Sequence, residues 1–277
     1  MVDCHIHMVL DGVYWKDSIK THAERPREDI CRRRLQRYKD LGYTYLRDGG
    51  DRWGAGALAR TLAPEYGITY RTPLAPLSMA GHYGGFIGLQ YADLTEYKNL
   101  VLAQKQQGAD FVKIMISGLM DFDRFGVLTE EGLPPRIIAE LIHIAHEEGM
   151  AVMAHANGAR TVEAAAAAGV DSVEHGAYLD DTALYAMKQA KTVWVPTLST
   201  VGNLRGKDRF CQKAVEQILE SSLLNLEKFH GMGGLVAPGT DAGAWAVPHG
   251  VDSEKMLLAM AGITDTAAAE QAIMEKF

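Results

Sequence analysis

The sequence repeats one pattern eight times: a short apolar or β-branched run, a glycine-rich or polar loop, and an amphipathic stretch of ten or more residues. Strands that alternate with helices in this way predict βαβ units and a parallel sheet. The expected strands are Met1–His7, Tyr43–Arg47, Thr69–Ala75, Phe111–Ser117, Ala151–His155, Ser172–His175, Thr192–Pro196 and Leu235–Thr240. The expected helices lie near 27–41, 55–66, 94–107, 134–148, 158–168, 180–190, 210–230 and 252–261, with a last amphipathic piece at 264–276.

Eight such units in 277 residues, about 35 residues each, favour a (β/α)8 barrel over an open sheet. We therefore expect an α/β protein whose residues 1–277 form a single TIM-barrel domain. In this architecture the loops that follow the strands build the active site at the carboxyl end of the barrel. The long loops at 8–26, 76–92, 118–133 and 197–209 are expected to form its mouth.

Composition and charge exclude several classes of partner. The chain has 28 Lys and Arg against 35 Asp and Glu, so it lacks the basic excess of a nucleic-acid-binding protein. The start, MVDCHIHMVLDG, has no basic segment, and no apolar run of about 18 residues occurs, so we expect no membrane association and a cytoplasmic location. The widely spaced Cys4, Cys31 and Cys211 predict reduced thiols in the core.

Histidine and aspartate residues stand where several expected strands end. His5 and His7 are two residues apart on one strand, so both side chains leave the same face and can share one metal ion. That spacing alone equally fits a hydrogen-bonded histidine pair. His155, His175 and Asp241 end three further strands, and their convergence at the carboxyl end of a barrel predicts a metal site.

Lys113 lies inside the apolar expected strand "ADFVKIMISG". A buried lysine is rare because removing its charge from water is costly, so its pKa falls or it acquires a partner. One interpretation pairs it with Asp110, Asp48 or Asp241. The other is that a neutral amine reacts with carbon dioxide to give a carbamate, an anion whose two oxygens can bridge two metal ions.

These residues, with the segments "ADFVKIM", "MAHANGARTVEAAAAAGVDSVEHG" and "PGTDAG", resemble the amidohydrolase superfamily, in its imidazolonepropionase-like and prolidase-like branch, over nearly the whole chain. The resemblance implies two divalent metal ions. Zinc is the expected metal, and manganese, cobalt, nickel and iron stay open. The implied ligands are His5, His7 and Asp241 for the first metal, His155 and His175 for the second, and Lys113, as a carbamate formed with carbon dioxide, between them.

The resemblance also implies an activity: hydrolysis of an amide C–N bond in a dipeptide, an N-acyl amino acid or a cyclic amide by metal-activated hydroxide, with Asp241 as the catalytic residue. The family's mononuclear deaminases show HxxE after strand 5, whereas Gly158 stands at the glutamate position here, which argues against base deamination. Two alternatives remain open. One is a lactone or phosphoester hydrolase that uses the same site, and the other is a metal-binding barrel without catalysis.

Contacts to a small-molecule substrate are expected from loop residues that could also be ordinary loop positions. These candidates are His82, Tyr83, Tyr178, Arg205 and His249. Members of this branch usually carry a small β-sandwich beside the barrel, and we expect this chain to lack it. Its absence would leave apolar surface on the outer helices, so a homo-oligomer is expected.

Overall fold

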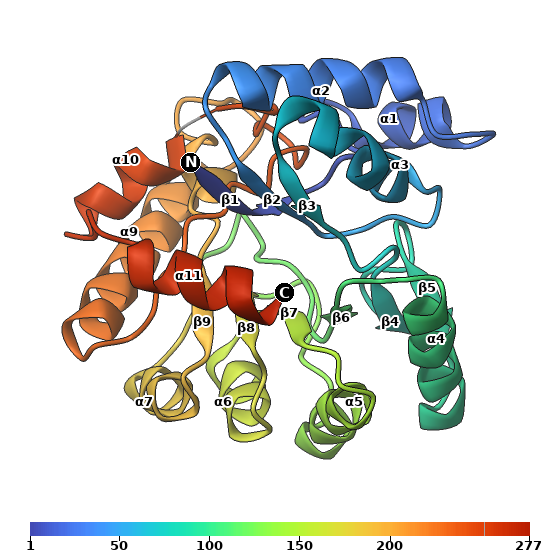
Figure 1. The fold of residues 1–277 in the computed structure, drawn as a ribbon. Coiled ribbons are helices and arrows are strands. Elements are labelled where there is room, and N and C mark those ends of the chain that lie inside the picture. The colour runs from blue at the N-terminus through green and yellow to red at the C-terminus, as the bar shows by residue number, and fades with distance from the viewer. Residues whose placement is uncertain (252) are drawn as a thin grey trace.

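The computed structural model, which describes residues 1–251 and 253–277, confirms the alternation of parallel strands and helices (Figure 1). The strands are β1 (Val2–Ile6), β2 (Tyr45–Asp48), β3 (Thr69–Arg71), β4 (Leu77–Met79), β5 (Leu89–Tyr91), β6 (Val112–Met115), β7 (Val152–Ala156), β8 (Ser172–His175) and β9 (Val193–Val195). The helices are α1 (Trp15–His22), α2 (Glu28–Asp40), α3 (Ala55–Leu62), the 3-10 helix η1 (Ala63–Tyr66), α4 (Leu94–Gln106), α5 (Pro135–Glu147), α6 (Ala159–Ala167), α7 (Asp181–Ala190), α8 (Ser199–Gly202), α9 (Gln212–Gly231), α10 (Ser253–Met260) and α11 (Ala267–Lys276). Within the described ranges, no helix is both long enough and apolar enough to cross a membrane.

The strands form two parallel sheets with the orders β1-β2-β3 and β5-β4-β6-β7-β8-β9. Isolated parallel bridges join Ile6 to Ala242 and Trp194 to Val236, so the segment after α9 runs between β9 and β1. Because the paired strands within each sheet are parallel, their carboxyl ends lie at the same edge of that sheet. Residues that follow those strands can therefore meet in one place.

The strand expected at Leu235–Thr240 was a wrong prediction, because this segment makes only the isolated bridge at Val236. Pro238 has no N–H group to donate to a strand ladder. The amide of Thr240 donates to the side chain of Asp3 at 2.9 Å instead of to a neighbouring backbone. The segment nevertheless follows a strand-like path, with hydrogen bonds from the Ala237 amide to the Trp194 carbonyl and from the Cys4 amide to the Pro238 carbonyl, both 2.9 Å.

Three expected loops contain short regular elements that the sequence pattern did not indicate. Residues 76–92 include β4 and β5, residues 8–26 include α1, and residues 197–209 include α8. Strands of three residues are too short to show a period, and β4 is defined by its pairing with β6. Cys4 and Cys31 are buried as expected, whereas Cys211 is exposed, which corrects the expectation for that thiol.

Helix α11 packs on the starts of the strands, at the end of the sheets opposite the candidate ligands (Figure 1). Its Ile273 and the adjacent Phe277 share an apolar cluster with Val2 of β1, Phe111 before β6 and Val193 of β9. Burial of this cluster removes apolar area from water and closes the amino end of the strands. The amino ends of these strands are therefore covered by apolar side chains.

Glu254 on α10 is a buried carboxyl group that holds the turn before α8. It accepts hydrogen bonds from the Leu198 amide at 2.9 Å, the Ser199 amide at 2.7 Å and the Ser199 hydroxyl at 2.8 Å. Burial raises the pKa of Glu254 to about 8, although these hydrogen bonds act in the opposite direction. The folded state therefore favours the protonated form more than the unfolded chain does.

A raised pKa in the folded state means that the contribution of Glu254 to stability is full below its unfolded pKa near 4.5 and is lost as the pH rises toward about 8. We expect Glu254→Gln, which stays neutral, to show a smaller fall in the free energy of unfolding than the native chain between about pH 5 and pH 8. Urea unfolding across that range measures it. Glu163→Gln, at an exposed position of α6, should keep the native pH dependence. Identical curves for all three proteins would contradict the assignment.

Candidate metal centre

His5, His7 and Asp241 meet at the carboxyl end of β1. The Nε2 atoms of His5 and His7 are 3.4 Å apart. Oδ1 of Asp241 lies 3.2 Å from His7 Nε2 and 3.6 Å from His5 Nε2. The backbone fixes this arrangement, because the Asp241 amide donates to the His5 carbonyl at 2.7 Å. Three potential ligand atoms, from the end of β1 and from the segment that follows residue 240, thus face one another.

His155 and His175 extend the cluster from the ends of β7 and β8. Their ring centroids are 4.6 Å apart, and the His175 ring lies 5.3 Å from that of His5. His175 and Asp241 have φ values of +68° and +58°, in the left-handed region that side chains other than glycine rarely adopt. Ligand atoms of His5, His175 and Asp241 all lie within 4.8 Å of one another. The strained backbone is part of what lets these side chains converge.

Three of the histidines have one ring nitrogen engaged by a protein oxygen, which leaves the other nitrogen available to a ligand. The pairs are His5 Nδ1 with Glu174 Oε2 at 2.8 Å, His175 Nδ1 with Thr197 Oγ1 at 2.7 Å, and His155 Nε2 with the Gly118 carbonyl at 3.2 Å. Such contacts fix the orientation of each ring before any cation binds.

Lys113 occupies β6 and is almost completely buried. Its Nζ atom has no hydrogen-bond partner among the described residues. Asp110, one of the partners considered for it, is instead bound by Arg60 and Arg71, each at 3.1 Å. Burial lowers the pKa of Lys113 to about 8, so a fraction of this amine is neutral near physiological pH.

Electrostatics favour neutral imidazoles and an ionised carboxylate in the cluster. Burial, followed by the charge of Lys113, lowers the pKa of His5 to about 4 and that of His155 to about 3. Burial likewise holds the pKa of His175 well below its ordinary value. Burial alone would raise the pKa of Asp241, but the neighbouring imidazoles and Lys113 outweigh it and lower that pKa. These are the protonation states in which histidine and aspartate bind metals.

Unpaired polar atoms in the cluster fit a divalent cation. His7 Nδ1, Lys113 Nζ and Asp241 Oδ1 are buried and accept or donate no well-formed hydrogen bond within the described part of the chain. A buried polar atom without a partner costs about 1–3 kcal/mol, so ligand binding at this place would offset a cost that the fold otherwise carries. Imidazole nitrogens with carboxylate oxygen form a donor set that suits zinc and related first-row metals.

The loop before β5 brings Tyr83, one of the predicted substrate contacts, to the cluster and places His82 beside Glu130. The ring centroid of Tyr83 lies 4.9 Å from that of His155. Glu130, in the loop after β6, accepts from the Tyr83 amide at 2.9 Å and contacts His82 Nδ1. Tyr178 follows His175 closely in the chain, and its hydroxyl is buried.

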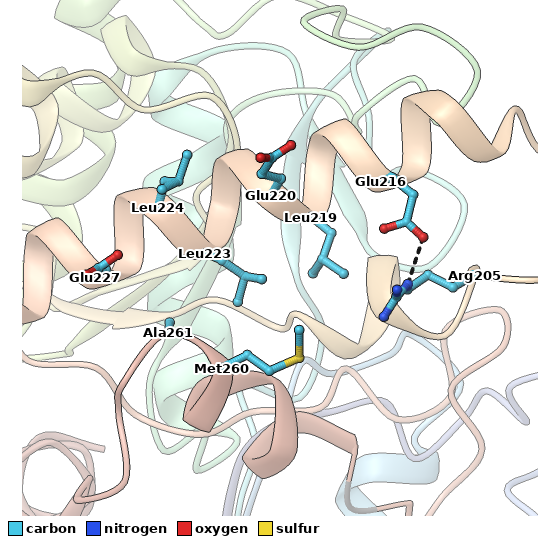
Figure 2. A pocket seen from close by; sticks show the side chains of 9 residues that line it. All are labelled: Arg205, Glu216, Leu219, Glu220, Leu223, Leu224, Glu227, Met260 and Ala261. Carbon is cyan, nitrogen blue, oxygen red and sulfur yellow. Dashed lines mark hydrogen bonds and ion pairs between the residues drawn. The ribbon is translucent and has the colours of Figure 1, made fainter.

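The structure directs the other two predicted contacts elsewhere. Arg205 forms an ion pair with Glu216 at 2.8 Å in a groove of about 290 Å³ along α9 and the end of α10 (Figure 2). His249 is buried, with Nε2 at 2.9 Å from the Leu10 carbonyl and Nδ1 at 3.0 Å from the Tyr38 hydroxyl. The polar atoms of both side chains are therefore engaged by other protein groups.

Two buried charges beside the cluster were missed in the sequence. Glu174 on β8 and Arg47 on β2 form an ion pair at 2.8 Å with no exposure. Burial alone would raise the pKa of Glu174, but the charge of Arg47 and the contact with His5 lower it to about 2. Strict alternation along a strand would place Glu174 on the face opposite His175. The signal that could have found the pair is the presence of charged residues in strands expected to be buried.

Comparisons with known proteins agree with this geometry. No family model matches the sequence. Ochratoxinase from Aspergillus niger is 26% identical over 235 residues, which cover 72% of this chain and 47% of that enzyme, so the chain spans about half the length of the curated relatives it matches. A Xaa-Pro dipeptidase structure superposes with a TM-score of 0.73 and 21% identity over 100% of this chain and 72% of its own. The structure of A. niger ochratoxinase gives 0.74 and 22% identity, over 98% and 68%.

The solved structures establish the shared fold, and ochratoxinase adds similarity in sequence. The chain thus resembles the amidohydrolase superfamily in sequence and in fold, and within it the prolidase-like members, as the sequence motifs predicted.

The Arg47–Glu174 pair generates a prediction about stability. Arg47→Met removes one partner and leaves the Glu174 charge buried without compensation, so we expect a loss of about 3–5 kcal/mol in the free energy of unfolding. Urea denaturation measures this loss. Arg33→Met on α2, whose ion pair with Asp29 is exposed, should leave the free energy of unfolding close to the native value. Similar small losses in both variants would show that the buried pair is unimportant.

Proposed function

We propose that this protein is a binuclear metal-dependent hydrolase that cleaves an amide C–N bond in a small molecule such as a dipeptide, an N-acyl amino acid or a cyclic amide. The observation that carries the proposal is the convergence of ligand atoms from His5, His175 and Asp241 within 4.8 Å. The unpaired Nζ of Lys113 beside them adds support. The similarity to ochratoxinase and to a Xaa-Pro dipeptidase favours amide hydrolysis over other uses of a metal site.

We propose a single (β/α)8 barrel over residues 1–277 as the frame of this site. The support is the path of residues 235–240, which hydrogen-bond to β9 on one side and to β1 on the other. In this interpretation the segment takes the place of the eighth strand. The ligands would then stand at the carboxyl end of the barrel, where enzymes of this architecture carry their active sites.

The proposed ligand sets follow the positions of the side chains. His5, His7 and Asp241 would hold one metal ion, and His155 and His175 the other. The neutral amine of Lys113 would form an N–C bond to carbon dioxide and release one proton, and the resulting carbamate would supply two oxygen ligands for the metal ions. Zinc is the metal we propose, because it suits nitrogen and oxygen donors together.

The ions would supply Lewis acidity and an activated water at neutral pH. Asp241 is the proposed catalytic residue, because its ionised carboxylate has an oxygen without a well-formed hydrogen bond in the described chain. It would accept a proton from the attacking water and deliver it to the leaving amine nitrogen. The Tyr83 ring covers His155 and would limit the access of bulk water.

We assign substrate contact to His82, Tyr83 and Tyr178. The contact of His82 Nδ1 with Glu130 leaves its Nε2 free to meet a polar group of the substrate. The buried hydroxyl of Tyr178 has a donor to offer. Arg205 and His249 are left out of this assignment, since their polar atoms bind other parts of the protein.

Metal analysis and a substrate panel test the proposal on the full chain. We expect about two ions per chain, loss of hydrolysis after chelation, and recovery when zinc is added. The panel contains dipeptides, N-acyl amino acids and cyclic amides, with lactones and phosphotriesters beside them. Cleavage of lactones or phosphotriesters alone would replace the amide assignment, and a metal-free chain that is well folded would refute the site.

Asp241→Asn separates catalysis from metal binding. We expect kcat to fall about 10²–10⁴-fold because the proton acceptor is lost, while metal content stays close to native. Asp181→Asn is the matched control, since that carboxylate is exposed on α7 and pairs only with Lys228 among the described residues. Native turnover in Asp241→Asn would contradict the proposed role.

We also propose self-association through the outer helices. Leu224, Met256 and Met260 are 54%, 63% and 55% exposed on α9 and α10, and apolar side chains that gather on a surface often mark an interface. Light scattering after gel filtration should give a mass that is a multiple of the chain mass. Met256→Lys with Met260→Lys should shift it toward the monomer, whereas a native protein that is already monomeric would exclude this interface.

A further inference from the structure

The carboxylate of Glu174 joins three strands beneath His5. Its Oε2 contacts His5 Nδ1 at 2.8 Å, and its Oε1 is contacted by Arg47 Nη2 at 2.8 Å and by the Ser172 hydroxyl at 2.6 Å. Arg47 in turn donates from Nε to the Cys4 carbonyl at 2.7 Å and from Nη1 to Ser172 at 3.0 Å. Both carboxylate oxygens therefore have hydrogen-bond partners: Oε2 has His5, and Oε1 has Arg47 and Ser172.

These contacts determine where the proton of His5 must lie. A guanidinium has only donors, so Arg47 holds Oε1 as an acceptor and stabilises the ionised carboxylate. An ionised carboxylate can only accept, so Nδ1 of His5 carries the hydrogen in its contact with Oε2. The lone pair of the neutral ring is then on Nε2, the atom that faces His7 and Asp241.

The Arg47–Glu174 pair is also shielded from water on the side of the Arg47 guanidinium, away from His5. The guanidinium of Arg47 lies 4.4 Å from the ring centroid of Phe277 and 6.0 Å from that of Phe111. Neither Arg47 nor Glu174 is exposed, so the attraction between them acts in a medium of low dielectric constant. The carboxylate cannot rotate away from His5 without losing this partner.

We propose that Glu174, held in place by Arg47, is a positioning residue that fixes the tautomer and ring orientation of His5 for metal binding. This inference rests on the metal site proposed above. The chemical logic is that of a carboxylate–histidine–metal arrangement, in which the outer hydrogen bond raises the basicity of the ligand nitrogen. Glu174 directly precedes His175. The end of β8 would therefore orient His5 at the first metal position and supply His175 as a ligand at the second.

Glu174→Gln tests the tautomer directly. The amide oxygen must stay with Arg47, because Arg47 cannot accept a hydrogen bond, so the amide NH₂ group would face His5 Nδ1. His5 would then carry its hydrogen on Nε2 and lose the lone pair that points into the site. We expect zinc affinity, measured by competition with a chromophoric chelator, to fall about 10–100-fold. Nitrogen-15 shifts of His5 in the metal-free protein should report the exchanged tautomer.

A second variant distinguishes positioning from general damage. In Arg47→Met with Glu174→Gln, the amide oxygen is released and can accept from His5 Nδ1, so the native tautomer and most of the zinc affinity should return. The double variant also lacks the unpaired buried charge, which keeps it testable if the single variant does not fold. Glu163→Gln on α6 is the exposed control and should match the native chain.

The outcomes separate this inference from the proposed function. A native chain that binds no zinc would refute the metal site and this inference with it. Native zinc binding that is unchanged in Glu174→Gln, or a native His5 tautomer in that variant, would overturn the role of Glu174 alone. A double variant that folds but binds zinc no better than the single variant, or that keeps the exchanged tautomer, would overturn it as well.

Discussion

Compensation of buried charge is the constraint on which the rest of this structure depends. Ionisable groups in an apolar interior are stable only where other groups balance them, and this chain buries Arg47, Glu174, Lys113 and Asp241 close together. Parallel strands make that possible, because residues far apart in sequence arrive at one edge. Helix α11 and the adjacent Phe277 close the amino end with apolar side chains, and the Arg47 guanidinium packs against the Phe277 ring.

The fold was predictable because the strands that form its centre are buried on both faces. Such strands appear as continuous apolar runs, and β1, β6, β7 and β8 lie close to the expected positions. The prediction failed where regular structure depends on partners and not on local pattern. Strands β4 and β5 are defined by their pairing with neighbouring strands. Residues 235–240 form no regular strand, because Pro238 has no N–H group to donate and the amide of Thr240 donates to Asp3.

The candidate site was predictable for a different reason, and only in part. His5, His155, His175 and Asp241 stand at strand ends in the sequence, and the architecture brings strand ends together. The supporting residues were missed because the rule of alternating faces fails where the backbone leaves the extended region. At His175 the left-handed turn brings its ring to the same side as Glu174, which no period in the sequence reveals.

The left-handed backbone at His175 and Asp241 implies a conflict between robustness and chemistry. Glycine adopts that conformation with little strain, whereas other residues incur about 1–2 kcal/mol, so stability alone would favour glycine at both positions. With an imidazole and a carboxylate at these positions, the folded state is less stable than this backbone conformation would permit with glycine. Replacing either residue with glycine would relieve this backbone strain, but it would also remove a side chain of the candidate metal site.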